Sequence, residues 1–332
     1  MGHGVSEEAA SEVKMLGRQR RAVMILSVAS LAFALLLVSI WTARNAASGQ
    51  SDPVINFARL VKITACFGLA WAFRSYIPSV HAMFWTGAAL VGISLGLYGI
   101  SFILGPAAPE YLPLGYLTGL FSGVGEACLI LVIAHLVAVF PPGLSTVAVP
   151  VVYLVNEVMF LGLSYASAAA LAWLRPVLKL ASVALAAWCL ARLSKHSLGG
   201  DVHPVQYGID GPRDASEHVL RFLGSSREWV LLLVGTTLFP FVFGAVSQVV
   251  GAAQALPGLY DPATELCAIG LLCLLVGYGL WRGPCLSYDE VLAWTFPLFA
   301  TGCLLLPVLW PQSPVVAGLL IKCGYTLYQV MF

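Results

Sequence analysis

The chain has 332 residues, of which 59% are hydrophobic and only 10% are charged, and its formal net charge is +1. About 25% of the residues in a typical soluble domain are charged. The composition therefore excludes an ordinary water-soluble globular domain. The net charge says little as a total, whereas the distribution of charges along the chain indicates how the chain is oriented.

Long apolar runs dominate the sequence and predict an all-α membrane protein. A helix needs roughly 20 apolar residues to cross the hydrocarbon core of a bilayer, and about ten runs of this kind are present. The first run lacks a cleavage site and is interpreted as a retained span. Six predicted spans precede the only long polar stretch and four follow it: 22–42, 55–77, 82–104, 112–139, 145–169, 173–193, 228–252, 264–281, 288–310 and 314–332.

The polar stretch 194–227 is rich in turn residues and charges, as is typical of a connector between two helical bundles. Lysine and arginine indicate the side of the membrane on which it lies. With a cytoplasmic N-terminus, the inner segments hold 11 of these basic residues and the outer loops hold only Arg44. Cytoplasmic segments carry an excess of basic residues. The connector and the N-terminus are therefore both predicted to be cytoplasmic.

The predicted domain organisation is a cytoplasmic tail (1–21), a six-helix bundle (22–193), the connector (194–227) and an incomplete bundle of four helices (228–332). This layout resembles the major facilitator superfamily, whose two six-helix halves are related by an axis along the membrane normal. The chain ends within an apolar run. We therefore expect that the last two helices of this major facilitator-like arrangement, and whatever follows them, are missing.

Other features point to one group of membrane-bound regulators. The loop 74–81 lacks the Gly-x-x-x-Asp-x-x-Gly-x-Arg/Lys motif of classical major facilitator transporters. The span layout and three short sequences are similar to the membrane half of LuxR-type transcriptional regulators of anaerobic actinobacteria: Gly119-x-x-x-Gly123-x-Gly125-Glu126, Phe140-Pro141-Pro142 and Gly324-Tyr325-Thr326-Leu327-Tyr328-Gln329. The resemblance implies a multi-pass sensor of the bacterial inner membrane, which contacts DNA only through a helix-turn-helix domain absent from this chain.

Ionisable side chains within the predicted spans are the candidate functional residues, because each costs roughly 2.5–3.5 kcal/mol to insert at the centre of a membrane helix. Glu126 and Glu157 lie toward the middle of the fourth and fifth spans. They form either a ligand or proton site or carboxyl groups that lock two helices together. Arg59 and Lys62 share one face of the second span, and Lys322 lies within the tenth. These three cations predict an anionic or carboxylate-bearing ligand that enters from outside.

Long basic side chains near span ends also extend to the lipid headgroups. This is the alternative interpretation of Arg59 and Lys62, and it is the expectation for Arg175 and Lys179 in the sixth span. Pro240 lies centrally in the seventh span and is the candidate hinge, because proline removes a backbone hydrogen bond from a helix.

The sequence contains no recognisable catalytic constellation, metal-ligand cluster or cofactor motif. Neither an enzymatic activity nor a cofactor is therefore expected. The predicted partners are the lipid bilayer and a small-molecule ligand or substrate. Two functions remain open: a sensor that signals to a cytoplasmic LuxR-type DNA-binding domain, and a major facilitator-type secondary transporter of a small anionic substrate.

Overall fold

A computed structural model describes residues 20–40, 53–73, 79–105, 110–138, 140, 142–195, 242, 262–282, 288–309 and 314–331. The regular structure within these residues is helical, and no strand occurs among them. The prediction of an all-α chain is confirmed for this part of the sequence.

The helices follow the predicted spans closely. The first helix is Arg20–Ile40, and the others are α2 (Pro53–Phe73), α3 (Val80–Leu104), α4 (Tyr111–Ala138), α5 (Pro142–Ser164), α6 (Ala168–Lys195), α9 (Pro262–Arg282), α10 (Tyr288–Leu309) and α11 (Pro314–Met331). Every predicted span except 228–252 therefore coincides with a helix. That span, apart from Val242, lies outside the described residues, as do Pro240 and the predicted connector after Lys195.

The turn between α5 and α6 differs most from the predicted boundaries. Helix α5 ends at Ser164 and α6 begins at Ala168, both earlier than the predicted positions. The side chain of Ser167 accepts a hydrogen bond from the Ala170 N–H at 3.3 Å. A serine oxygen at this position satisfies a backbone N–H that the first helical turn leaves free. The start of α6 is set by this cap, which hydropathy does not detect.

Four helices are long and apolar enough to cross a membrane by length and composition: Arg20–Ile40, Val80–Leu104, Tyr111–Val137 and Trp173–Leu193. Shorter apolar helical segments lie in α5, α9, α10 and α11: Val147–Leu163, Glu265–Trp281, Ala293–Leu309 and Val315–Val330. A run of about 20 apolar residues matches the thickness of the hydrocarbon core. The chain is therefore a helical membrane protein.

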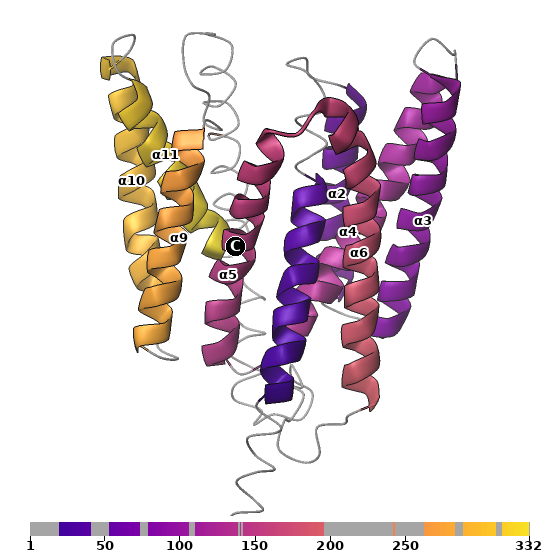
Figure 1. Cartoon of the computed structure of the whole chain (residues 1–332), viewed down its shortest axis with the longest axis horizontal. Coiled ribbons are helices and arrows are strands. Elements are labelled where there is room, and N and C mark those ends of the chain that lie inside the picture. The colour runs from indigo at the N-terminus through magenta and orange to yellow at the C-terminus, as the bar shows by residue number, and fades with distance from the viewer. Residues whose placement is uncertain are drawn as a thin grey trace, which may run out of the picture. The chain divides into compact units, whose positions relative to one another are not determined.

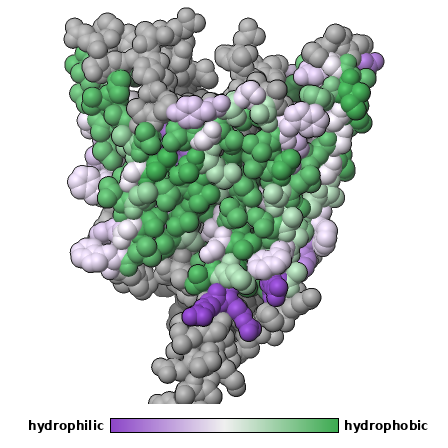
Figure 2. Space-filling view, in the orientation of Figure 1, coloured by the Kyte–Doolittle hydropathy of each residue, from purple (hydrophilic) through white to green (hydrophobic). Residues whose placement is uncertain are grey.

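The described surface is largely apolar. The exposed fraction is 84% for Ile103, 81% for Trp281 and 74% for Val308. Figure 2 shows apolar residues over most of the described part of one face, with strongly hydrophilic residues at its lower margin. Monomeric soluble proteins rarely expose contiguous apolar patches larger than a few hundred Å². An exterior of this kind is suited to lipid.

The chain is divided into two compact units. Unit 1 comprises Met1–Ala148 and Val158–Ser197, and unit 2 comprises Val149–Glu157 and Leu198–Phe332. The middle of α5 therefore belongs to unit 2, while its two ends belong to unit 1. Each unit contains a buried cluster of charged side chains.

Helix α4 contacts both α2 and α3 in unit 1. Three of its glycines face α2 at intervals of four residues: Gly115, Gly119 and Gly123. A Cβ atom at Gly123 would lie 2.8 Å from the carbonyl oxygen of Ala58, and one at Gly125 would lie 3.0 Å from that of Gly87 in α3. Small residues at such intervals allow membrane helices to approach each other closely. The glycines of α4 therefore set its distance from both neighbours.

Helix α6 also packs in unit 1. It contacts α3 and α4, and the Ser182 hydroxyl donates a hydrogen bond to the Ala32 carbonyl oxygen of the first helix at 2.7 Å. Because α6 lies against α4, a polar side chain on the contacting face of α6 is able to reach α4.

The same type of packing joins α10 and α11 in unit 2, which lie side by side (Figure 1). A Cβ atom at Gly324 of α11 would lie 2.8 Å from the backbone nitrogen of Phe299, and one at Gly302 of α10 would lie 2.8 Å from that of Ile321. The buried side chains Phe299, Ile321 and Tyr328 form a hydrophobic cluster. Helix α9 contacts α11, so α11 carries contacts to two neighbouring helices.

Candidate functional site

A buried group of polar side chains lies where α2, α4 and α6 converge in unit 1. We call it the Glu126 cluster, and its members are Lys62 of α2, Ser122 and Glu126 of α4, and Lys179 of α6. Ser122 and Glu126 share a face of α4 because residues four apart are neighbours on a helix surface. The close packing of Gly123 against the backbone of α2 holds Lys62 beside this face.

Both carboxylate oxygens of Glu126 have partners. Its Oε1 atom accepts a hydrogen bond from the Ser122 hydroxyl at 2.7 Å and forms an ion pair with the Lys179 ammonium group. The same ammonium group donates to the Ser122 oxygen at 2.7 Å. The Lys62 ammonium nitrogen lies 3.4 Å from Oε2. Glu126 is thus the common acceptor for cations from two other helices.

The Glu126 cluster has an excess of positive charge. It holds two lysines and one carboxylate, and the exposed fractions of the Lys179 and Glu126 side chains are only 3% and 6%. Burial away from water strengthens electrostatic interactions, because the surrounding dielectric constant is low. The unbalanced positive charge therefore attracts an anion more strongly than an exposed lysine would.

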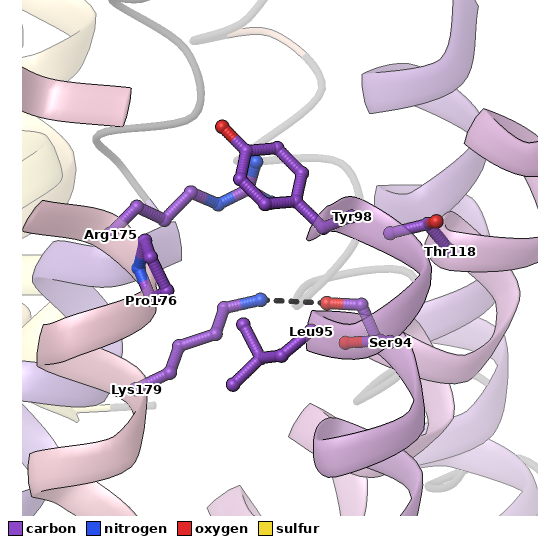
Figure 3. Close-up of a pocket in the computed structure, with 8 residues that line it drawn as sticks. Ser94, Leu95, Tyr98, Thr118, Arg175, Pro176 and Lys179 are labelled. Carbon is purple, nitrogen blue, oxygen red and sulfur yellow. Dashed lines mark hydrogen bonds between the residues drawn. The ribbon is translucent and has the colours of Figure 1, made fainter. Parts of the chain in front are cut away.

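A small cavity of about 20 Å³ adjoins the cluster. Residues of α3, α4 and α6 line it: Ser94, Leu95, Tyr98, Thr118, Ser122, Arg175, Pro176 and Lys179. Figure 3 shows Arg175 and Lys179 extending from α6 toward the side chains of α3 and α4, with the hydrogen bond of Lys179 drawn. The Nε atom of Arg175 is buried and has no hydrogen-bond partner within the described structure. The cavity is thus lined by two cations from α6, Arg175 and Lys179, and by hydroxyl groups from α3 and α4.

A second group of buried charges lies in unit 2. We call it the Lys322 cluster, and it consists of Glu157 of α5, Glu265 of α9 and Lys322 of α11. The Lys322 ammonium nitrogen lies 3.4 Å from Glu157 Oε2 and 3.1 Å from Glu265 Oε1. The balance of charges is the reverse of that in the Glu126 cluster, since one cation here faces two carboxyl groups.

The residues predicted from the sequence are distributed over both clusters. Lys62 pairs with Glu126 in unit 1, and Lys322 pairs with Glu157 in unit 2. The three predicted cations thus belong to different units. Arg59 is half-buried on α2 and has an interaction of its own. The candidate hinge, Pro240, lies outside the described residues.

The expectation that Lys179 and Arg175 extend to the lipid headgroups is wrong for Lys179. The exposed fraction of Lys179 is 2%, because Glu126 and Ser122 of α4 lie within reach of its ammonium group. Arg175 is half-buried and lines the cavity. The spacing of these two cations, four residues apart on one helix face, was the available signal that they act together.

Sequence reasoning also missed Ser122 and Glu265. Ser122 precedes Glu126 by one helical turn, so their shared face was predictable. A serine within an apolar run does not, however, indicate a functional site by itself. Glu265 lies in the first turn of α9, where an acidic residue usually serves to stabilise the helix N-terminus. Its role in the Lys322 cluster depends on contacts with α5 and α11, which the sequence does not specify.

Comparisons with known proteins found no match, either among protein-family models or among curated protein sequences.

Proposed function

We propose that this chain is the membrane-embedded part of a small-molecule sensor that binds a small anion at the cavity beside the Glu126 cluster. The observation that carries the proposal is the excess of positive charge there among the described residues. Lys62 and Lys179 both pair with the carboxylate of Glu126, and Arg175 lines the adjoining cavity as a third cation. An anion in the cavity restores the charge balance without a further protein side chain.

The side chains around the cavity suit a carboxylate or a small inorganic anion. Arginine presents several N–H donors in a planar arrangement that matches carboxylate geometry, and the buried Nε of Arg175 is available as a donor. The hydroxyl groups of Ser94, Thr118 and Tyr98 line the same cavity. Hydrogen bonds with a charged partner are roughly twice as strong as those between neutral groups. The predicted ligand class is therefore a small carboxylate or an anion of similar size.

The size of the cavity links binding to a change in helix packing. A volume of about 20 Å³ holds roughly one water molecule. An organic anion enters only if α3, α4 and α6 move apart locally. A ligand shifts a conformational equilibrium by its difference in affinity for the two states. Occupation of this cavity therefore favours a wider arrangement of unit 1, and such a change is the signal that a sensor transmits.

The output of the proposed sensor rests on the resemblance to LuxR-type regulators. In this proposal the chain crosses the bacterial inner membrane about ten times, in a major facilitator-like arrangement with its N-terminus in the cytoplasm. The signal passes to a cytoplasmic DNA-binding domain outside this chain. The basic residues of the inner segments support this orientation through the positive-inside rule.

A secondary transporter is the second candidate. The division into two compact units, each with a buried charged cluster, favours it. Secondary transporters with internal repeats work largely by rigid-body movement of one bundle against the other. The substrate class is the same in this case, a small anion.

Anion binding is tested with the purified full chain in lipid nanodiscs. We expect sodium acetate to raise the apparent Tm, because a ligand that binds only the folded state stabilises it by RT ln(1 + L/Kd), where L is the free ligand concentration. Sodium gluconate at the same concentration, whose anion is bulkier, should have a smaller effect. The shift should disappear in Arg175→Gln. Arg192→Gln is the matched control, because Arg192 lies on the same helix and is exposed.

Two outcomes decide the test. An acetate-dependent shift of equal size in Arg175→Gln and the wild type excludes the cavity as the binding site. Accumulation of radiolabelled acetate in liposomes that contain the wild-type chain, but not in empty liposomes, favours the transporter over the sensor.

A further inference from the structure

The Lys322 cluster of unit 2 contains a buried carboxylate oxygen that lacks a partner. Glu265 is only 1% exposed. Its Oε1 atom faces the Lys322 ammonium group at 3.1 Å, but its Oε2 atom has no hydrogen-bond partner within the described structure. An unpartnered buried acceptor is costly, since it has lost its water without gaining another donor. This oxygen is therefore a position where an additional donor is favourable.

The charges of the Lys322 cluster are also unbalanced. Glu157 and Glu265 interact with each other as well as with Lys322. With all three groups ionised, the cluster carries one net negative charge in apolar surroundings. Burial disfavours such an unbalanced charge, and two adjacent carboxylates disfavour each other's ionisation. Both effects are removed when one carboxyl group holds a proton.

The other titratable groups near the cluster do not supply the missing positive charge. In the described part of unit 2 these groups are Tyr153 on α5, Cys267 on α9, and Cys323 and Tyr328 on α11. Tyrosine and cysteine side chains carry no positive charge in either of their protonation states. Within the described part of unit 2, the charge balance of the cluster therefore depends on the two carboxyl groups and Lys322.

We propose that Glu157 and Glu265 form a binding site for one exchangeable proton, with Glu265 Oε2 as the atom that receives it. The proton comes from water and forms an O–H bond on Glu265, which makes the three-residue cluster neutral. Its release to water restores the second carboxylate and the net negative charge. No bond between heavy atoms forms or breaks. The site is separate from the anion cavity of unit 1 and does not depend on the function proposed there.

A proton fits this site better than a metal cation does. The Lys322 ammonium group already contacts both carboxyl groups, so it occupies the place where a metal ion would bind and repels a second cation. A proton needs only the unpartnered oxygen.

Two further buried oxygen atoms lie on the helices that carry Glu157 and Lys322. Thr326 lies one turn after Lys322 on α11, so the two share a helix face, and Asn156 precedes Glu157 on α5. Thr326 Oγ1 and Asn156 Oδ1 are both buried and have no hydrogen-bond partner within the described structure. A protonated carboxyl group, unlike a carboxylate, is able to donate to an acceptor of this kind.

Infrared spectroscopy of the full chain in lipid nanodiscs tests the proposal directly. We expect the carbonyl stretching band of a protonated carboxylic acid at neutral pH, shifted by deuterium exchange and lost reversibly at alkaline pH. The band should disappear in Glu265→Gln. Glu110→Gln is the matched control, because Glu110 is exposed before the start of α4, and it should leave the band unchanged.

The wild-type chain alone is able to overturn the proposal, so the test does not depend on the folding of a variant. Absence of the band at neutral pH means that both carboxyl groups are ionised and that the site is empty. A band that does not respond to pH or deuterium excludes exchange. Persistence of the band in both Glu265→Gln and Glu157→Gln assigns it to another residue and overturns the proposal equally.

Discussion

Gly123 of α4 lies directly against the backbone of Lys62 in α2. A Cβ atom at Gly123 would be only 3.1 Å from the Lys62 backbone nitrogen. Ser122 directly precedes Gly123 and Glu126 follows it by three residues, and the Lys62 side chain reaches Glu126 Oε2 at 3.4 Å. The ion pair between these helices therefore depends on the absence of a side chain at Gly123.

Substitution Gly123→Val should separate α2 from α4 and destabilise unit 1. The added Cβ would lie 2.8 Å from the Ala58 carbonyl oxygen. This is a backbone atom, so α2 itself would have to shift to relieve the clash. Overpacking of this kind costs about 1–3 kcal/mol. Thermal unfolding in detergent should show a lower apparent Tm. Gly99→Val is the control, since no atom lies within 4 Å of a Cβ at Gly99; equal losses in both variants would contradict the packing argument.

Substitution Glu126→Gln should be strongly destabilising, because Lys62 and Lys179 lose their shared carboxylate while remaining buried. Removal of one partner from a buried ion pair costs about 3–5 kcal/mol. The measurement is the apparent Tm, with exposed Glu110→Gln as the control. The double variant Glu126→Gln/Lys179→Met should regain part of the loss, because it removes the most buried of the unpaired charges. A Tm near that of the wild type for Glu126→Gln would show that the ion pairs contribute little.

Cysteine reactivity should distinguish the helix faces. Cys267 and Cys273 of α9 are exposed, whereas Cys128 and Cys189 are buried. In membranes, an apolar maleimide that dissolves in lipid should modify Cys267 and Cys273 first. A membrane-impermeant charged maleimide should react more slowly with them than with a cysteine placed in an aqueous loop. Peptide mass spectrometry gives the order of modification. Faster reaction of Cys189 than of Cys267 would contradict the described burial.

The predicted orientation is tested by a cysteine in the connector. Gly200→Cys in a chain whose native cysteines are replaced by serine or alanine should be labelled by a charged maleimide only after the inner membrane of intact cells is made permeable. The positive-inside rule gives this expectation. Labelling in intact spheroplasts would place the connector outside and overturn the proposed topology, including a cytoplasmic DNA-binding output.

The positions of the helices could be read from the sequence, because long apolar runs and helix boundaries are local properties. Every predicted span that the structure describes coincides with a helix. The boundary between α5 and α6 was the largest error, since the Ser167 cap decides it. The structure pairs Lys62 with Glu126 and Lys322 with Glu157, although the sequence grouped the cations and the acids separately and predicted neither pairing.

The partners of individual charges were harder to predict, because they depend on which helix faces meet. Lys179 was expected at the lipid headgroups, but the packing of α6 places it beside Glu126. Nothing in the sequence around Glu265 distinguishes it from an ordinary acidic residue at the start of a helix. Its interactions are with Glu157, 108 residues earlier in the chain, and with Lys322, 57 residues later.

The exposed faces of α9 and α10 have a practical consequence for anyone who handles this protein. Leu274 and Leu304 are each 72% exposed on these helices, so water would contact an apolar surface there. Dilution below the concentration at which detergent forms micelles should make the chain precipitate by self-association, whereas amphipols or nanodiscs should keep it dispersed.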